Sequence, residues 1–184
     1  MELVWPADEH LQSYVDALNR GWSPDNIRGD VARQEELQHI ARNPRGFLAS
    51  LVDREARGAP VTLADGTVVP RLPGYRRWMW DGEFCGSIGF RWQPGTEALP
   101  PYTPGHIGYA VVPWKEGRGY ATLALRLMLD EVRREGLRYV YLIAQPGNVA
   151  SRRVIEKNGG VFVDEFVAQV HGTTPALRFR VDLT

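Results

Sequence analysis

The chain has 184 residues, 43% of them hydrophobic, which is enough for one ordinary domain with its own core. Its 22 basic and 22 acidic residues balance, so no overall charge draws it to nucleic acid or to an anionic membrane surface. The single cysteine, Cys85, excludes an internal disulfide framework and a cysteine-rich metal site. We therefore expect one metal-free domain over residues 1–184 in a reducing compartment, the cytoplasm.

The first third of the chain predicts a strand followed by helices. Residues 3–5 are typical of a short strand, and apolar residues recur at helical spacing as far as Arg20. A second helix is expected over about Asp30–Arg42, and a third, shorter helix over residues 47–54. The start of the chain has no signal-peptide pattern, and no window is apolar enough to span a membrane. We expect a protein that is neither exported nor membrane-bound.

The middle of the chain predicts two β-hairpins and a loop. One hairpin is expected from residues 61–63 and 67–69, around Asp65-Gly66. The stronger signal comes from the β-rich runs 76–80 and 84–90, which flank the two-residue turn Asp81-Gly82. Four prolines between residues 94 and 105 then predict a loop.

The last part of the chain alternates strands and helices. In order, we expect a strand at Ile107–Val112, a long amphipathic helix at about Gly117–Glu135, a buried strand at Tyr139–Ala144, a short helix at Asn148–Lys157, and strands at residues 161–163 and 177–181.

The start of the long helix suits an anionic ligand. A helix start exposes unpaired N–H groups and the positive end of the helix dipole. Gly117 and Gly119 carry no side chain that would keep a phosphate away, so pyrophosphate is a natural ligand here. Two glycines before a helix can also make an ordinary tight turn, so this short pattern does not decide the matter.

The stretch from His106 to Phe162 resembles the cofactor-binding half of the GNAT superfamily of acetyltransferases. The family's first motif is a strand, then Arg/Gln-x-x-Gly-x-Gly/Ala, then a helix, and here Gly119 and Ala121 occupy its last two fixed positions. Glu116 departs from the Arg/Gln position, which we expect to weaken cofactor binding modestly. The resemblance implies that acetyl-CoA binds at the following residues: Gly117, Arg118, Gly119, Tyr120 and Ala121.

A second motif, Asn-x-x-Ser, begins the short helix at Asn148 and Ser151. In the family these two residues contact coenzyme A, so the resemblance assigns both to the cofactor; Asn148 can equally well be a plain helix cap. The residues 151–160 are most similar to a bacterial subgroup of uncharacterised predicted acetyltransferases. The resemblance therefore implies a cofactor but no particular acceptor.

The strand Gly108–Val112 resembles the fourth GNAT strand, which splays from its neighbour and leaves room for pantetheine. The resemblance implies that a backbone N–H of Val111 or Val112 binds the thioester carbonyl and stabilises the negative charge that develops on it. An ordinary apolar strand would show the same residues.

The groups that move protons are less well defined by the sequence. Many relatives place a Tyr on the short helix to protonate the leaving thiolate, but this chain has Ile155 there. Glu83, Tyr109, Glu97 and His106 are available as a base, and we prefer His106 or Glu97. Each also has a structural interpretation, as a surface charge or a core residue.

The resemblance implies an α/β fold of the α+β type, with a mixed, mostly antiparallel central sheet and helices on both faces. The cofactor-binding half covers about residues 105–165. The expected activity is direct transfer of an acetyl group from acetyl-CoA to a primary amine, of a small molecule or a protein, in a ternary complex. The alternative is a non-catalytic acyl-CoA-binding or sensor module. A homodimer is compatible with the sequence.

Overall fold

The structure is a computed structural model of the chain and describes residues 1–26, 28–63, 66–167 and 175–183. Its α-helices are α1 (Asp8–Asn19), α2 (Gly29–Arg42), α3 (Pro44–Ser50), α4 (Tyr120–Val132) and α5 (Val149–Lys157). Its strands are β1 (Glu2–Val4), β2 (Val52–Asp53), β3 (Val61–Thr62), β4 (Val68–Val69), β5 (Gly74–Trp80), β6 (Phe84–Arg91), β7 (Ile107–Val111), β8 (Tyr139–Ala144), β9 (Val161–Val167) and β10 (Pro175–Asp182). Single turns of 3-10 helix lie at Pro113–Lys115 and Arg133–Glu135.

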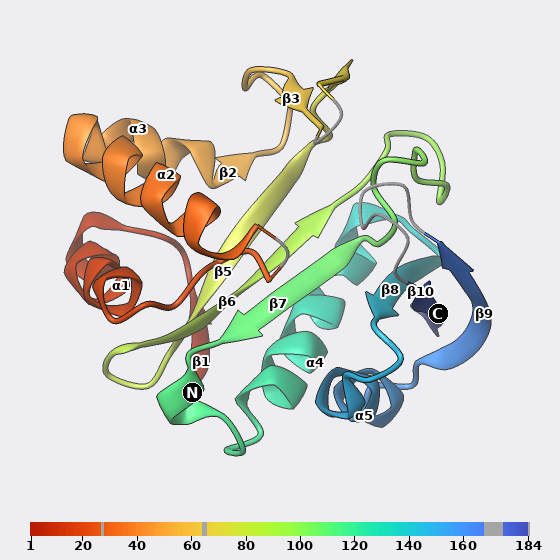
Figure 1. Cartoon of the computed structure of the whole chain (residues 1–184). Coiled ribbons are helices and arrows are strands. Elements are labelled where there is room, and N and C mark those ends of the chain that lie inside the picture. The colour runs from red at the N-terminus through yellow and green to blue at the C-terminus, as the bar shows by residue number, and fades with distance from the viewer. Residues whose placement is uncertain (27, 64–65, 168–174, 184) are drawn as a thin grey trace.

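Two antiparallel sheets lie side by side (Figure 1). The first has the strand order β1-β5-β6-β7, with β2 also paired to β5, and the second has the order β8-β10-β9. The strands β3 and β4 form a separate hairpin. The facing strands β7 and β8 contact each other but share no ladder within the described residues. The expected α/β fold, with mostly antiparallel strands, is confirmed.

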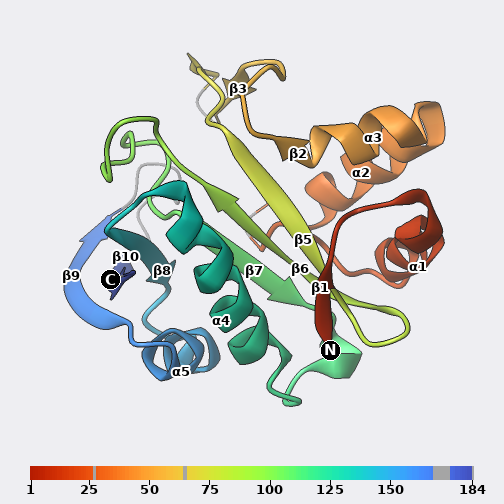
Figure 2. The same cartoon turned by 180° about the vertical axis from the view of Figure 1, so that it is seen from behind.

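Helices cover both faces of the first sheet (Figures 1 and 2). The larger core lies between α4, α5 and both sheets, and the smaller core lies under α1 and α3. Successive residues of β5 alternate between them, with Trp78 in the smaller core and Met79 in the larger one. In the described residues no helix is long and apolar enough to cross a membrane, and no three potential metal-binding side chains are grouped.

The third helix lies earlier in the chain than predicted. It spans Pro44–Ser50 rather than residues 47–54, and residues 52–53 form the strand β2. The Asn43 side chain accepts a hydrogen bond from the Gly46 N–H at 2.9 Å, and proline is well suited to the first position of a helix. The pair Asn43-Pro44 therefore starts a helix as well as ending one.

Both predicted hairpins are present, but the turn of the stronger one differs. Its loop contains three residues, Asp81–Glu83, and the pairing slips by one residue between Met79 and Trp80. The Lys115 ammonium contacts the Asp81 and Glu83 carboxylates at 2.5 and 2.8 Å, so a contact from a distant segment shapes this turn. In the weaker hairpin, formed by β3 and β4, the predicted turn residue Asp65 lies outside the described residues.

Candidate functional site

The helix α4 begins at a loop of two left-handed glycines. Gly117 and Gly119 have φ angles of 74° and 77°, which side chains other than glycine adopt with strain, so this segment is not helical and α4 begins only at Tyr120. No atom lies within 4 Å of the position that a Cβ would take at either glycine. Within the described part of the chain, the N–H groups of residues 117–122 have no hydrogen-bond acceptor. The loop therefore presents a row of free donors at the positive end of a helix dipole.

The hairpin between β5 and β6 holds this loop in place. Lys115 is only 5% exposed and contacts Asp81, while the Tyr120 hydroxyl donates to the other oxygen of the same carboxylate at 2.6 Å. Burial opposes ionisation of Asp81, but the hydrogen bonds from Lys115 and Tyr120 outweigh it and hold the pKa of Asp81 well below its usual range. Tyr120 thus has a structural contact of its own, whereas Arg118 is exposed beside the free N–H groups.

A gap separates β7 from β8, and hydrogen bonding on the β6 side shows which backbone groups face it. The N–H of Val112 donates to Cys85 O, and the N–H of Arg91 donates to His106 O, both at 2.9 Å. Because hydrogen bonds alternate along an antiparallel ladder, the N–H groups of Tyr109 and Val111 point away from β6, toward β8. Of the two predicted thioester donors, Val112 is therefore occupied and Val111 is directed into the gap.

The start of the gap is closed by His106. The His106 N–H donates to Tyr141 O at 2.8 Å, and the Tyr141 N–H donates to His106 Nδ1 at 2.9 Å. His106 is completely buried, and its Nε2 has no partner among the described residues. Burial, with the nearby charge of Arg91, lowers the pKa of His106 to about 4, so the ring is neutral near pH 7. Its one lone pair is already engaged, which does not favour the predicted role as a base.

Glu97, the second residue predicted as a base, forms an ion pair with Arg138. Arg138, just before β8, donates to its two carboxylate oxygens at 2.7 and 3.3 Å. These hydrogen bonds lower the pKa of Glu97 to about 2, which makes the carboxylate a very weak base. The contact fastens the proline-rich loop to the start of β8. The structure thus places both preferred base candidates at the closed end of the gap.

At its other end the gap is bounded by the start of α5. The Asn148 side chain caps this helix by accepting from the Ser151 N–H at 3.0 Å. The Tyr109 and Ser151 hydroxyls lie 2.9 Å apart, across the gap, and burial raises the pKa of Tyr109 to about 12. Ile155 is completely buried in the larger core. The sequence did not predict the Tyr109–Ser151 pair, because the two residues lie on separate elements and nothing local links them.

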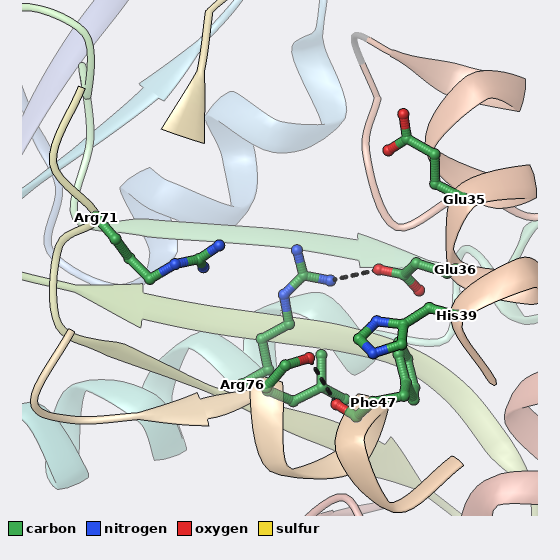
Figure 3. Close-up of a pocket in the computed structure, with 8 residues that line it drawn as sticks. Glu35, Glu36, His39, Phe47, Arg71 and Arg76 are labelled. Atoms are coloured by element: carbon green, nitrogen blue, oxygen red, sulfur yellow. Dashed lines mark hydrogen bonds and ion pairs between the residues drawn. The ribbon is translucent and has the colours of Figure 1, made fainter. Parts of the chain in front are cut away.

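A cavity of about 320 Å³ lies on the face of the first sheet that α1 and α2 cover. Its lining residues are Glu35, Glu36, His39, Phe47, Ser50, Leu51, Arg71 and Arg76. The Arg76 guanidinium contacts Glu36 at 3.4 Å, and Figure 3 shows the side chain of Arg71 directed toward that of Arg76. This cavity draws on α2, α3, β5 and the segment before β5, so no single motif in the sequence marks it.

Comparison with protein families gives a match to one family. Residues 7–161 match the model described as the acetyltransferase (GNAT) domain. This range contains the α4 loop, the gap and the start of α5. A search of curated proteins gave no significant match.

Comparison with solved structures gives acetyltransferases at low sequence identity. One of them is described as a probable acetyltransferase; 59% of this chain aligns with it at 23% identity, with a TM-score of 0.48. The chain spans 61% of that protein, which is less than two thirds of its length. RimL, a ribosomal-protein α-N-acetyltransferase in complex with coenzyme A, aligns over 98% of this chain and 92% of its own, with 14% identity and a TM-score of 0.61. A chimera of the Vibrio cholerae spermidine N-acetyltransferase SpeG and hSSAT aligns over 100% and 97%, with 12% identity and a TM-score of 0.60. The RimL and SpeG similarities show the fold.

Proposed function

Because the chain belongs to the acetyltransferase (GNAT) family, we propose that it moves an acetyl group from acetyl-CoA to a primary amine. The observation that carries this proposal is the row of unpaired N–H groups at residues 117–122, placed beside the gap between β7 and β8. RimL is described as a ribosomal-protein α-N-acetyltransferase, and its structure contains coenzyme A. SpeG is described as a spermidine N-acetyltransferase. These similarities support an amine of a small molecule or a protein as the acceptor.

The N–H groups of the α4 loop would bind the pyrophosphate of the cofactor, with Arg118 adding a positive charge. Asn148 and Ser151, at the start of α5, would contact its pantetheine arm in the gap. Acetyl-CoA supplies the thioester whose carbonyl carbon the amine attacks. The Val111 N–H would donate to the carbonyl oxygen and stabilise the negative charge that develops there.

The hydroxyl pair of Tyr109 and Ser151 would serve the departing sulfur. With its pKa near 12, Tyr109 stays protonated at neutral pH, while an ordinary thiol has a pKa of about 8.5. Full proton transfer from the phenol to the thiolate is therefore unfavourable, and a hydrogen bond is the more effective contribution. We propose that this pair stabilises the thiolate until it takes a proton from solvent.

His106 and Glu97 would have positioning roles in this mechanism. The single lone pair of the His106 ring accepts from the Tyr141 N–H, and both carboxylate oxygens of Glu97 accept from Arg138, so each is engaged in a protein contact. We propose that both hold the closed end of the gap, and that the amine arrives unprotonated and loses its second proton to water.

The test combines binding and turnover. Saturating acetyl-CoA or coenzyme A should raise the melting temperature, because a ligand at 100 times its Kd adds about 2.7 kcal/mol, while free acetate should not. Thiol release from acetyl-CoA is then followed across a panel of amines. If neither cofactor shifts the transition, the cofactor site is wrong. Tight binding without turnover of any amine would favour the non-catalytic acyl-CoA-binding module instead.

A further inference from the structure

We propose that the acceptor is a small amine that also carries an acidic group, a carboxylate or a phosphate, and that Arg91 binds this group. The proposal rests on the acetyl transfer proposed above and assigns its acceptor class. It arises from the face of the first sheet that α1 and α2 cover, opposite α4.

Arg91, the last residue of β6, reaches over the neighbouring strand. It pairs with His106 through the backbone, and its exposed side chain lies on the same face as Arg76. A Cβ at Gly108 would lie 3.5 Å from Arg91 Nη2, so the guanidinium stands above the backbone of β7. The side of β7 that has no ladder partner borders the gap. Arg91 therefore brings a positive charge over the strand whose Val111 N–H is proposed to bind the thioester.

The strands beneath this guanidinium carry small residues. On this face Gly89 of β6 is paired with Gly108 of β7, and Ser87 is paired with Ala110. A Cβ at Gly89 would lie only 3.3 Å from Arg76 Cγ, so the stem of that arginine crosses β6 in the space that glycine leaves. The small residues thus leave room for two guanidinium groups on a face of the sheet near the gap.

The glutamates that line the cavity on this face already have partners, while Arg91 does not. Glu36 accepts from the Tyr14 hydroxyl and contacts Arg76, and Glu35 pairs with Arg28 at 2.5 Å. In the described residues Arg91 has no hydrogen bond or ion pair through its side chain, although Asp25 attracts it electrostatically.

Arg71 adds a further positive group at the cavity. Its guanidinium donates to a backbone carbonyl, that of Ala59, at 2.9 Å, and is directed toward Arg76 (Figure 3). In the described residues neither Arg71 nor Arg91 forms an ion pair with a carboxylate, although backbone hydrogen bonds, and also the charge of Arg71, lower the pKa of Asp53. A ligand with an anionic group would pair with these guanidinium groups, whereas a polyamine would be repelled by them.

The spacing sets the shape of the acceptor. Val111 lies three residues beyond Gly108, which is about 10 Å along a strand. The amine and the acidic group should therefore be separated by several bonds. The neighbouring cavity of about 320 Å³ matches the lower end of the usual range for small-molecule sites, which favours a small acceptor over a protein.

The experiment compares a series of acceptor amines of increasing length, with purified protein and acetyl-CoA. Thiol release is measured with ω-amino carboxylates from glycine to 6-aminohexanoate, with their uncharged amides, with aminoalkyl phosphates, and with spermidine. We expect kcat/KM at least tenfold higher for longer acidic acceptors than for their amides. The carboxylate and phosphate arms show which acidic group is preferred.

Arg91→Gln keeps a polar side chain but removes the charge. It should reduce the acid-to-amide ratio of kcat/KM to near one and leave the KM for acetyl-CoA within about twofold. Arg126→Gln, an exposed arginine of α4, is the matched control and should keep the wild-type ratio. A preference for the uncharged amides or for spermidine, or an Arg91→Gln variant that keeps the acid-to-amide ratio, would overturn the proposal.

A binding measurement covers the case in which no amine is turned over. With coenzyme A present, N-acetyl-5-aminovalerate should raise the melting temperature more than its amide does, and Arg91→Gln should remove the difference. Equal shifts in the wild-type protein would overturn the acidic-acceptor proposal. The absence of any effect of acetyl-CoA would instead count against the proposed function, so the two failures are distinguishable.

Discussion

The two ends of the gap between β7 and β8 are built in opposite ways. At the closed end His106 and Tyr141 exchange two hydrogen bonds, and the His106 side chain is completely buried. At the open end the backbone N–H groups of residues 117–122 have no acceptor among the described residues. The first end pairs the backbone groups of Tyr141 within the protein, and the second leaves its backbone N–H groups for a ligand.

We infer that the closed end contributes mainly to the stability of the fold, and the open end mainly to the proposed binding of the cofactor. A buried, satisfied contact resists opening, whereas unpaired donors cost little only while water or a ligand reaches them. We therefore expect changes at His106 to act mainly on folding, and changes at the α4 loop to act mainly on cofactor binding.

The largest effect is expected at the closed end. The pKa of His106 is about 4 in the folded protein and 6.5 in an unfolded chain, so below pH 6.5 the unfolded state binds more protons. Stability from this residue is complete above pH 6.5 and is lost as the pH falls toward 4, by about 3 kcal/mol in total. Urea denaturation of the wild-type protein and His106→Gln across this range measures the difference.

His106→Gln should also lower stability at pH 7, because the Tyr141 N–H loses a well-placed acceptor, at a cost of about 1–3 kcal/mol. If His106→Gln loses stability with falling pH as steeply as the wild-type protein does, the buried neutral histidine is not the cause.

At the open end, Gly119→Glu should lower the affinity for acetyl-CoA about 100-fold, or about 2.7 kcal/mol. The substitution places an anion among the donors proposed to bind pyrophosphate. Gly119→Ala is the matched control, because it carries the same strain at φ 77° without the charge. Calorimetric titration of coenzyme A measures both variants, and circular dichroism should show that both stay folded. Equal affinities of the Ala and Glu variants would show that charge at this position is irrelevant.

The smallest effect is expected across the middle of the gap. Tyr109→Phe should lower kcat about tenfold if its hydroxyl donates to the leaving sulfur, because tenfold is about 1.4 kcal/mol, close to the lower end of the roughly 1.5–3 kcal/mol that hydrogen bonds to charged groups contribute. Tyr109→Phe removes the hydroxyl but keeps the ring, so the packing of β7 against α5 should change little. An unchanged kcat would remove this role.

Ile155→Tyr is the contrasting substitution on α5. Ile155 is completely buried, and the Gly160 backbone packs closely against it, so the larger ring should cost about 1–3 kcal/mol of stability without raising kcat. A stable and faster Ile155→Tyr enzyme would show that a phenol fits on α5 after all.

Several features of the fold could be predicted from short stretches of sequence. The glycine loop before α4 and the cap at Asn148 depend on neighbouring residues alone: glycines adopt positive φ, and an Asn side chain reaches the N–H three residues later, although the helix itself begins at Tyr120 rather than at Gly117. For the same reason the strand Tyr139–Ala144 was predicted with the bounds that the structure has. The family resemblance then supplied the mostly antiparallel arrangement of the sheet and the cofactor.

Other features were decided only by tertiary contacts. The register of β7 on β6 directs the N–H of Val111 rather than that of Val112 into the gap, and Lys115 contacts the turn at Asp81–Glu83 from a distant segment. Packing brings Arg138 to Glu97, which no local pattern reveals. These outcomes depend on which distant residues meet when the sheets and helices pack, and strand register and burial are properties of that packing rather than of any single segment.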